Sequence, residues 1–377
     1  MSKKNSINIL KDISPECFIK NHWGKKYLFL ENAIEIENAV ITKRTIGKLI
    51  RNPDIFSKLI IQQNNSSETF YGPFNELPKQ KINSLLIYKF HHIQKFAHEL
   101  SQSVNFIPYC LHDDVMVSFS SKDGGVGPHS DSYDVFLIQG SGSKKWSIGK
   151  TDKSRFQLGE KSHSNETFKA EYTIISNPGD ILYIPPFTPH HGVALSDDCT
   201  TYSVGFRSPS NDEIRTRYLE FLMDNVISKA SIFEDLDIDT NLKSSIPQSL
   251  VSFIKNNALL KNSNICIDDF IGIILSEPDS DIFFRKQKKI SDSFIMRFEE
   301  VTLYLNIKSR AINHNKLFFI NGEKLSISDN NHRFFIKFFD NKKITINPIE
   351  LNLELKGLIT YLLSEGYIDI HQPKFPL

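Results

Sequence analysis

Short apolar segments separated by turn-forming residues dominate the chain from about residue 21 to residue 207. The clearest segments are VMVSFS, YDVFLIQG, KWSIG, DILYIPP and TYSVGF, and Gly, Pro, Asn or Asp stand between them. Repeated short strands with turn signals between them predict a β-sandwich or barrel. Helical stretches, such as INSLLIYKFHHIQKFAHEL at 82–100, are expected before this strand-rich block.

The pattern changes to helical periodicity after residue 207. Ser210 and Glu213 form the S-x-x-E signature of a helix N-terminus. Apolar residues then recur every four positions, as expected for one face of an amphipathic helix: Ile214, Tyr218, Leu222 and Val226. Further helical runs, PQSLVSFIKNNALL and DDFIGIILSEP, extend the pattern. A helical domain over 209–305 is therefore predicted, and its apolar faces suit a homodimer.

The C-terminal region mixes strands and helices again. Asn321 and Gly322 form a hairpin signal within LFFINGEKLSI, and the helical segment IELNLELKGLITYLLSEGYIDI follows. This order predicts a small winged-helix-like domain over 306–377. The region carries no strongly basic recognition helix, so direct nucleic-acid binding is not expected.

Composition describes a soluble protein with several domains. The 377 residues are 40% hydrophobic and 24% charged, with a formal net charge of +1, which argues against a surface built throughout for polyanions. No apolar run is long enough for a membrane span, and no signal peptide is seen. The four cysteines are dispersed without a C-x-x-C pair, so a reducing, cytoplasmic location is expected.

A metal site is indicated by two segments of the strand-rich block. His129 and Asp131 are separated by one residue, so in extended chain their side chains point the same way. The segment PPFTPHHG supplies a third ligand, for which we favour His190, with the adjacent His191 at the pocket rim. Two histidines and a carboxylate on one side of Fe(II) leave positions for a 2-oxo acid and O2.

The H-x-D pattern is weak evidence alone, since His112 and Asp114 repeat it. The alternative interpretation is an ordinary β-barrel with a histidine pair at its mouth. The glycine-rich approach to His129, the proline-rich approach to His190 and the nearby Lys144 favour the metal site.

Lys144 is a candidate anion ligand at the start of the strand after His129. A buried ammonium needs a partner, and the distal carboxylate of 2-oxoglutarate would suit it. Lys145 should face solvent, because neighbours on a strand alternate. Ser118 and Ser120 share one face of their strand and could complete the carboxylate pocket; ordinary surface serines are the equal alternative.

Several long motifs occur in an order that resembles one family. GGVGPHSDSYDVFLIQGSGSKKW, GDILYIPPFTPHHG and YSVGFRSP, with FIKNHWGKKYLFLENAI and YGPF before them, resemble the bacterial ribosomal-oxygenase branch of the Jumonji-C, cupin-type hydroxylases. The resemblance covers essentially the whole chain. It implies a mixed α and β protein: a double-stranded β-helix (jelly-roll or cupin) catalytic domain over 1–208, a helical dimerisation domain over 209–305 and a winged-helix-like domain over 306–377.

The resemblance also implies an activity, namely Fe(II)- and 2-oxoglutarate-dependent hydroxylation of a ribosomal protein with O2. Its closest form is hydroxylation of an arginine β-carbon in large-subunit ribosomal protein sixteen. By position, the metal ligands are His129, Asp131 and His190, and the co-substrate ligands are Ser118, Ser120 and Lys144. Tyr133, Asp134 and His191 are hypothetical substrate contacts, although Asp134 could instead only orient its strand.

Two positions depart from the arginine-modifying subgroup. Lys144 stands where arginine is common, and a lysine binds a carboxylate as a point charge where arginine forms a fork. His191 replaces the glutamate of a typical PHEG, which changes the rim. Three alternatives therefore stay open: a histidine or asparagine hydroxylase, a demethylase or small-molecule oxygenase on the same core, and a non-catalytic ribosome-binding cupin.

Overall fold

The chain divides into two compact units in the computed structural model. The first unit comprises Met1–Ser208, Asn306–Lys308 and His371–Leu377, and the second comprises Pro209–Leu305 and Ser309–Ile370. The structure describes residues 7–36, 41–63, 66–76, 84–150, 169–207, 209–225, 252, 266–286 and 298–375.

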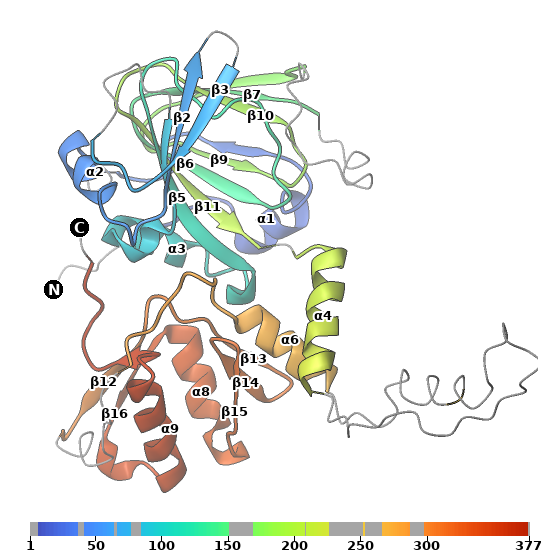
Figure 1. Ribbon diagram of the computed structural model, residues 1–377, viewed down its shortest axis with the longest axis vertical. Helices are drawn as coiled ribbons and strands as arrows, with labels where there is room; N and C mark the ends of the chain where they lie inside the picture. The colour runs from blue at the N-terminus through green and yellow to red at the C-terminus, as the bar shows by residue number, and fades with distance from the viewer. Residues whose placement is uncertain are drawn as a thin grey trace, which may run out of the picture. The chain divides into compact units, whose positions relative to one another are not determined.

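The first unit is built on two antiparallel sheets (Figure 1). The larger has eight strands in the order β1 (Leu28–Leu30), β9 (Ile181–Ile184), β6 (Val135–Ser141), β11 (Cys199–Phe206), β5 (His112–Ser120), β4 (Ser84–Ile87), β2 (Ser57–Gln63) and β3 (Ser66–Tyr71). The smaller has the order β10 (His190–Ala194), β7 (Lys144–Ile148) and β8 (Tyr172–Ser176).

Each face of the larger sheet buries an apolar cluster. One face packs against α1 (Pro15–Asn21), α2 (Lys43–Leu49) and α3 (Lys95–Ser103), which contribute Phe18, Ile46 and Phe96 to the larger core. The other face packs against the smaller sheet through Val135, Leu137, Trp146, Ile148, Leu182 and Ile184. Removing these side chains from water stabilises the pair of sheets, with about 25 cal/mol gained per Å² of apolar surface buried. The space between the sheets is where β5, β7 and β10 direct their polar side chains.

The strands predicted from the apolar segments are confirmed as β5, β6, β7, β9 and β11. The helix expected over 82–100 is wrong in its first half: Ser84–Ile87 form β4, Phe90–His92 form the 3-10 turn η1, and only Lys95–Ser103 are α-helical. All four residues of β4 are buried, because this strand lies inside the sheet between β5 and β2. A short continuous apolar run of this kind does not distinguish a fully buried strand from a helix.

The second unit begins with α4 (Asn211–Asn225) and continues with α6 (Ile267–Ser276). The predicted capping interaction is present, since Glu213 N donates to Ser210 Oγ at 3.1 Å. Tyr218 and Phe221 of α4 contact the ring of Phe270 in α6, at 5.0 and 5.4 Å between centroids. The predicted helical run PQSLVSFIKNNALL lies outside the described residues except for Ser252, which is helical.

Two small antiparallel sheets and two helices complete the second unit. The strands are β12 (Val301–Leu305), β16 (Lys343–Ile346) and β17 (Ile368–Asp369) in one sheet, and β13 (Ala311–His314), β14 (Leu317–Ile320) and β15 (Glu323–Leu325) in the other. The hairpin predicted at Asn321–Gly322 joins β14 to β15, with φ of 52° and 82° at its two residues. Helices α8 (Asp329–Asn341) and α9 (Leu353–Ser364) share one apolar core with β12 and β16. Among the described helices of the protein, none is long and apolar enough to cross a membrane.

Candidate metal centre and co-substrate pocket

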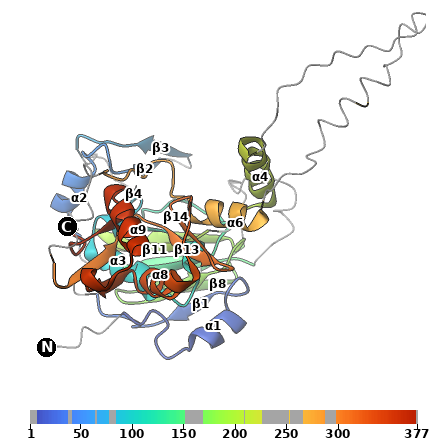
Figure 2. The ribbon, with the colours of Figure 1, turned by 90° about the horizontal axis from the view of Figure 1, so that it is seen from below.

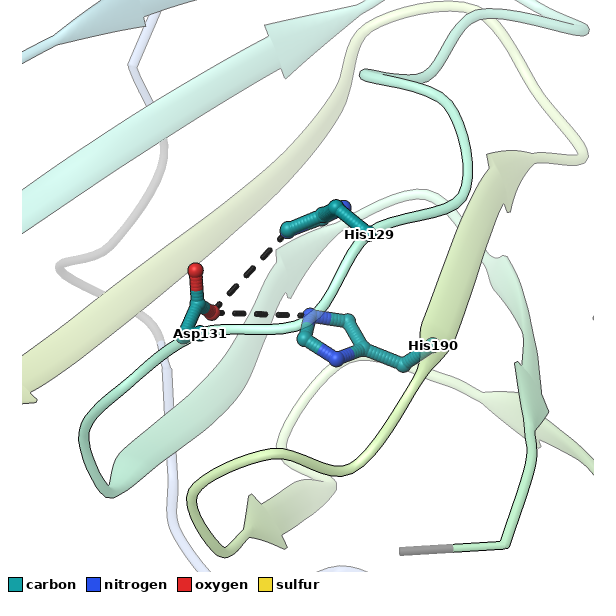
Figure 3. Close-up of side chains that lie close together, drawn as sticks. All are labelled: His129, Asp131 and His190. Atoms are coloured by element: carbon teal, nitrogen blue, oxygen red, sulfur yellow. Dashed lines mark ion pairs between the residues drawn. The ribbon is translucent and has the colours of Figure 1, made fainter. Parts of the chain in front are cut away.

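Three side chains converge at one end of the space between the sheets of the first unit. His129 Nε2 lies 3.9 Å and His190 Nε2 lies 3.7 Å from Asp131 Oδ2 (Figure 3). One ligand atom from each residue lies within 4.8 Å of the other two. Both measured separations exceed hydrogen-bond length, so the groups surround a shared point without bonding directly to one another.

The backbone fixes this convergence. His129 N donates to His190 O at 3.0 Å, and His190 N donates to His129 O at 2.8 Å, forming an isolated antiparallel bridge. Phe187 N donates to Asp131 O at 2.7 Å. His129 and Asp131 therefore lie in the segment just before β6, outside the named strands, and His190 is the first residue of β10.

Each imidazole is oriented by its second nitrogen. His129 Nδ1 is 3.0 Å from Gly127 O, and His190 Nδ1 is 2.9 Å from Thr188 O. A carbonyl can only accept, so both Nδ1 atoms carry the proton and both Nε2 atoms present a lone pair to the shared point. Burial and the neighbouring His129 lower the pKa of His190, which favours its neutral, ligating form. This donor set fits a divalent transition metal.

Two glycines explain the glycine-rich approach to His129. A Cβ at Gly125 would lie 2.4 Å from the carbonyl oxygen of Gly192, so the two backbones can approach only without a side chain there. Gly127 has φ of +85°, a left-handed conformation that other residues rarely adopt. Its carbonyl is the acceptor that orients His129. The glycines thus place the ligand loop against β10.

Lys144 lies inside the unit on β7, with 5% of its surface exposed. Its Nζ is 3.4 Å from Thr201 Oγ1 and 5.0 Å from the ring centroid of Trp146. The Trp146 ring in turn lies 6.0 Å from that of His190, which links the lysine to the ligand cluster. Burial lowers the pKa of Lys144. Lys145, its neighbour, is exposed as predicted.

The serines of β5 are buried, so the alternative of ordinary surface serines is wrong. Ser118 is 5% exposed and its Oγ is 3.4 Å from Thr201 O; Ser120 is fully buried and shares a 2.6 Å hydrogen bond with Ser84. Thr201 therefore contacts both Ser118 and Lys144. The Ser118 hydroxyl and the Lys144 ammonium thus lie on either side of Thr201 inside the unit, and each can donate to an anion.

The three residues expected to contact a substrate occupy different surroundings. Tyr133 is largely buried, and burial together with the nearby Asp131 and Asp114 raises its pKa. His191 alternates with His190 on β10 and is half-buried, and its pKa is lowered mainly by burial. Asp134 is 5% exposed and accepts hydrogen bonds from Gly24 N at 3.0 Å and from Tyr183 Oη. This geometry favours the interpretation in which Asp134 orients its strand.

Asp114 and Tyr88 are site residues that the sequence did not indicate. Asp114 Oδ1 and Tyr133 Cε2 both lie beside Gly205, at 3.7 and 3.8 Å from the position of an added Cβ. Burial raises the pKa of Tyr88 to about 12, with Asp114 and Asp131 adding to the effect. Asp114 belongs to the second H-x-D pattern, whose His112 instead lies 3.0 Å from Ile107 O. Alternation along β5 places Asp114 on the same face as Ser118, a signal that was present in the sequence.

Comparisons with known proteins agree with this geometry. The JmjC domain model matches residues 99–214, which contain all three convergent side chains. A probable ribosomal oxygenase of Haemophilus influenzae is 33% identical over 261 residues, covering 67% of this chain and 62% of that protein. Ribosomal protein uL16 3-hydroxylase of Escherichia coli is 31% identical over 230 residues, covering 59% of this chain and 60% of the relative. The matches thus span about three fifths of these relatives.

The fold is also that of a solved structure. YcfD, a ribosomal oxygenase from Escherichia coli determined in complex with cobalt and 2-oxoglutarate, superimposes with a TM-score of 0.76 at 24% identity, over 96% of this chain and 99% of that one. The whole chain thus has a YcfD-like architecture around a β-sheet core. The chain therefore contains a segment that matches the JmjC domain model, and it is similar in sequence to bacterial ribosomal oxygenases.

Proposed function

We propose that this protein is an Fe(II)- and 2-oxoglutarate-dependent oxygenase that hydroxylates an arginine β-carbon of ribosomal protein uL16. The observation that supports this most is the arrangement of a two-histidine, one-carboxylate cluster beside a buried lysine, with Trp146 between them. The sequence relationship to a uL16 3-hydroxylase supports the substrate.

His129, Asp131 and His190 would hold the metal through two Nε2 atoms and one carboxylate oxygen. Ferrous iron, when bound, supplies activation of dioxygen coupled to oxidative decarboxylation of 2-oxoglutarate to succinate. With three protein ligands from these residues, a bound metal would keep positions for the co-substrate and O2. The His129–His190 bridge holds both imidazoles in place, so little reorganisation accompanies binding.

Lys144, Ser118 and Ser120 would bind the distal carboxylate of 2-oxoglutarate. In the described part of the chain no carboxylate forms an ion pair with Lys144, and a buried cation without an anion is costly. The dicarboxylate would supply the missing negative charge. The Thr201 hydroxyl lies next to Lys144 and can add a hydrogen bond, which offsets the lack of a forked arginine.

Tyr133 and Asp114 would receive the target arginine. Both side chains lie beside Gly205, and a guanidinium bound there can pair with the carboxylate while packing on the ring. His191, half-buried next to the third metal ligand, would line the rim. The local carboxylate and aromatic ring would attract a cationic side chain, although the protein as a whole is nearly neutral.

The remaining domain assignments extend this proposal. The first unit would be a double-stranded β-helix, 209–305 a dimerisation domain and 306–377 a winged-helix-like domain. Helix α4 exposes large apolar side chains, with Leu219 at 61% and Met223 at 79%, and a second copy of the chain would cover them in a homodimer. The winged-helix-like domain would serve protein contacts rather than nucleic acid.

Incubation of the purified protein with Fe(II), 2-oxoglutarate and recombinant uL16 tests the proposal. We expect succinate and a mass increase of one oxygen atom, mapped by fragmentation to one arginine. A panel of histidine, asparagine and methyl-lysine peptides separates the alternative activities. Absence of succinate with every substrate would favour the non-catalytic alternative.

The two aspartates Asp114 and Asp134 provide a matched pair of variants. Asp114→Asn is expected to raise KM for uL16 by about tenfold to a hundredfold, because a charge-assisted hydrogen bond is lost. Asp134→Asn is expected to leave that KM unchanged and to lower the free energy of unfolding by about 1–2 kcal/mol, since Asp134 bonds to Gly24 and Tyr183 inside the protein. Steady-state kinetics measure KM, and urea unfolding measures the free energy of unfolding. A raised KM in Asp134→Asn with an unchanged KM in Asp114→Asn would show that Asp134 contacts the substrate.

A further inference from the structure

Three aromatic rings extend from the metal site toward the surface of the first unit. Tyr88 is partly buried, Phe56 is 50% exposed and Tyr71 is 63% exposed. The ring centroids of Tyr88 and Phe56 are 5.0 Å apart, and those of Phe56 and Tyr71 are 6.1 Å apart with planes inclined by only 21°. We call Tyr88, Phe56 and Tyr71 the aromatic row.

The inner end of the aromatic row belongs to the site already described. The charges of Asp114 and Asp131 act on the Tyr88 hydroxyl, and Tyr88 N donates to Phe56 O at 3.1 Å. Lys89 N donates to Asp114 Oδ2 at 3.1 Å. The backbone that carries Tyr88 is therefore tied both to the acidic pocket and to the next ring of the row.

The outer end lies on the face of the sheet that also carries the co-substrate serine. Tyr71 is opposite Lys58, Lys58 is opposite Leu86, and Leu86 is opposite Ser118. Directly paired residues point to the same face, so Tyr71 and Ser118 share a face across four strands. Strands β2 and β3, which hold this end, run side by side at the edge of the sheet (Figure 2).

The neighbouring Phe70 points the other way. It pairs with Leu59, Leu59 pairs with Leu85, and Leu85 pairs with Phe119. The last three belong to the core beneath the helices, on the opposite face of the sheet. Phe70 is 44% exposed against 63% for Tyr71, so it is a ring of similar size that is also exposed but faces away from the site.

We infer that the aromatic row binds the substrate polypeptide beside the target residue, and that Phe56 and Tyr71 determine specificity for that segment. This rests on the function proposed above. Large exposed aromatic rings contiguous with a catalytic pocket are typical anchors of recognition surfaces. The row begins beside Asp114 and Asp131 and ends in solvent. A polypeptide whose reacting side chain lies in the site would leave the site along such a path.

The dimensions and charge of the aromatic row define what it binds. Its two ring-to-ring steps of 5.0 and 6.1 Å together match about three residues of extended chain, at about 3.3 Å per residue. Lys58, directly opposite Tyr71, disfavours a cation at the outer end. The occupant is a large apolar side chain about three residues from the hydroxylated arginine.

Kinetics of Phe56→Ala and Tyr71→Ala in the full chain test this inference, with uL16 and with peptides spanning its hydroxylated arginine. KM for uL16 should rise by about tenfold in each variant while kcat changes little, and KM for 2-oxoglutarate should stay unchanged. Phe70→Ala should leave all three constants unchanged. In uL16, alanine replacement of the apolar residue about three positions from the arginine should raise the KM of the wild-type protein. The same replacement should cause no further rise in KM for the Tyr71→Ala variant.

Photo-crosslinking provides a second measurement that does not depend on variant kinetics. Benzoylphenylalanine at position 71 should crosslink uL16 within a few residues of the hydroxylated arginine, and the same group at position 70 should not. Unchanged KM in both variants, or equal crosslinking from both positions, would overturn the inference while hydroxylation by wild-type protein continued. Failure of the proposed function has a different signature, because wild-type protein would then hydroxylate no ribosomal protein at all.

Discussion

His190→Ala is expected to lower hydroxylation by at least about a thousandfold, because the proposed metal site would lose the most buried of its three side chains. The loss of several kcal/mol of metal-derived stabilisation corresponds to a rate decrease of this order. His190 also forms half of the bridge to His129, but through backbone atoms that alanine retains. The variant should therefore keep its fold and lose its metal.

The adjacent His191 supplies the matched control. His191→Ala removes an imidazole from the same strand, on the face that alternates with the ligand. Titration calorimetry with Mn(II) or Co(II) should show wild-type affinity for His191→Ala and strongly reduced affinity for His190→Ala. Equal metal affinity in the two variants would refute the assignment of His190 as a ligand.

Lys144→Met is expected to raise KM for 2-oxoglutarate by about a hundredfold, because the dicarboxylate loses a buried charged partner. Lys144→Arg should recover most of the affinity, since arginine also binds a carboxylate and the site needs a cation rather than a particular shape. Lys145→Met, one residue along and exposed, should leave this KM unchanged. Succinate formation at varied 2-oxoglutarate measures all three.

Lys144→Met should weaken 2-oxoglutarate binding, but it should not lower the stability of the ligand-free protein. Lys144 is buried and its pKa is lowered by that burial, so its charge is destabilising until an anion arrives. The Met variant of the ligand-free protein should therefore unfold at the same or higher urea concentration than wild type. Added 2-oxoglutarate with Mn(II) should stabilise wild type only. A marked loss of stability in the ligand-free Met variant would show that Lys144 is a structural residue.

The metal cluster could be predicted because its determinants are local. His129 and Asp131 are two residues apart in extended chain, and His190 follows a proline-rich turn after an apolar strand, so each position carries its own signal. The place of Asp114 in the site could not be predicted in the same way. Its proximity to Tyr133 depends on the position of Gly205 in β11, which is set by pairing between strands far apart in sequence.

The same reason explains the errors. Ser84–Ile87 have an apolar pattern compatible with either a helix or a buried strand. They form a strand because they pair with β5 and β2 on either side. The partnership of Ser84 with Ser120 follows from that place and could not be foreseen. For Asp134, three residues after Asp131, the sequence allowed either a substrate contact or a role in orienting its strand, and its hydrogen bonds to Tyr183 and Gly24 favour the second.

The paired backbone hydrogen bonds between His129 and His190 have a consequence for how the protein would bind and release a metal ion. Main-chain hydrogen bonds already hold these two residues together, so their arrangement does not depend on a bound metal ion. If these residues bind a metal as proposed, removing the metal with a chelator should therefore leave the fold intact, and the protein should bind metal again on mixing without having to refold.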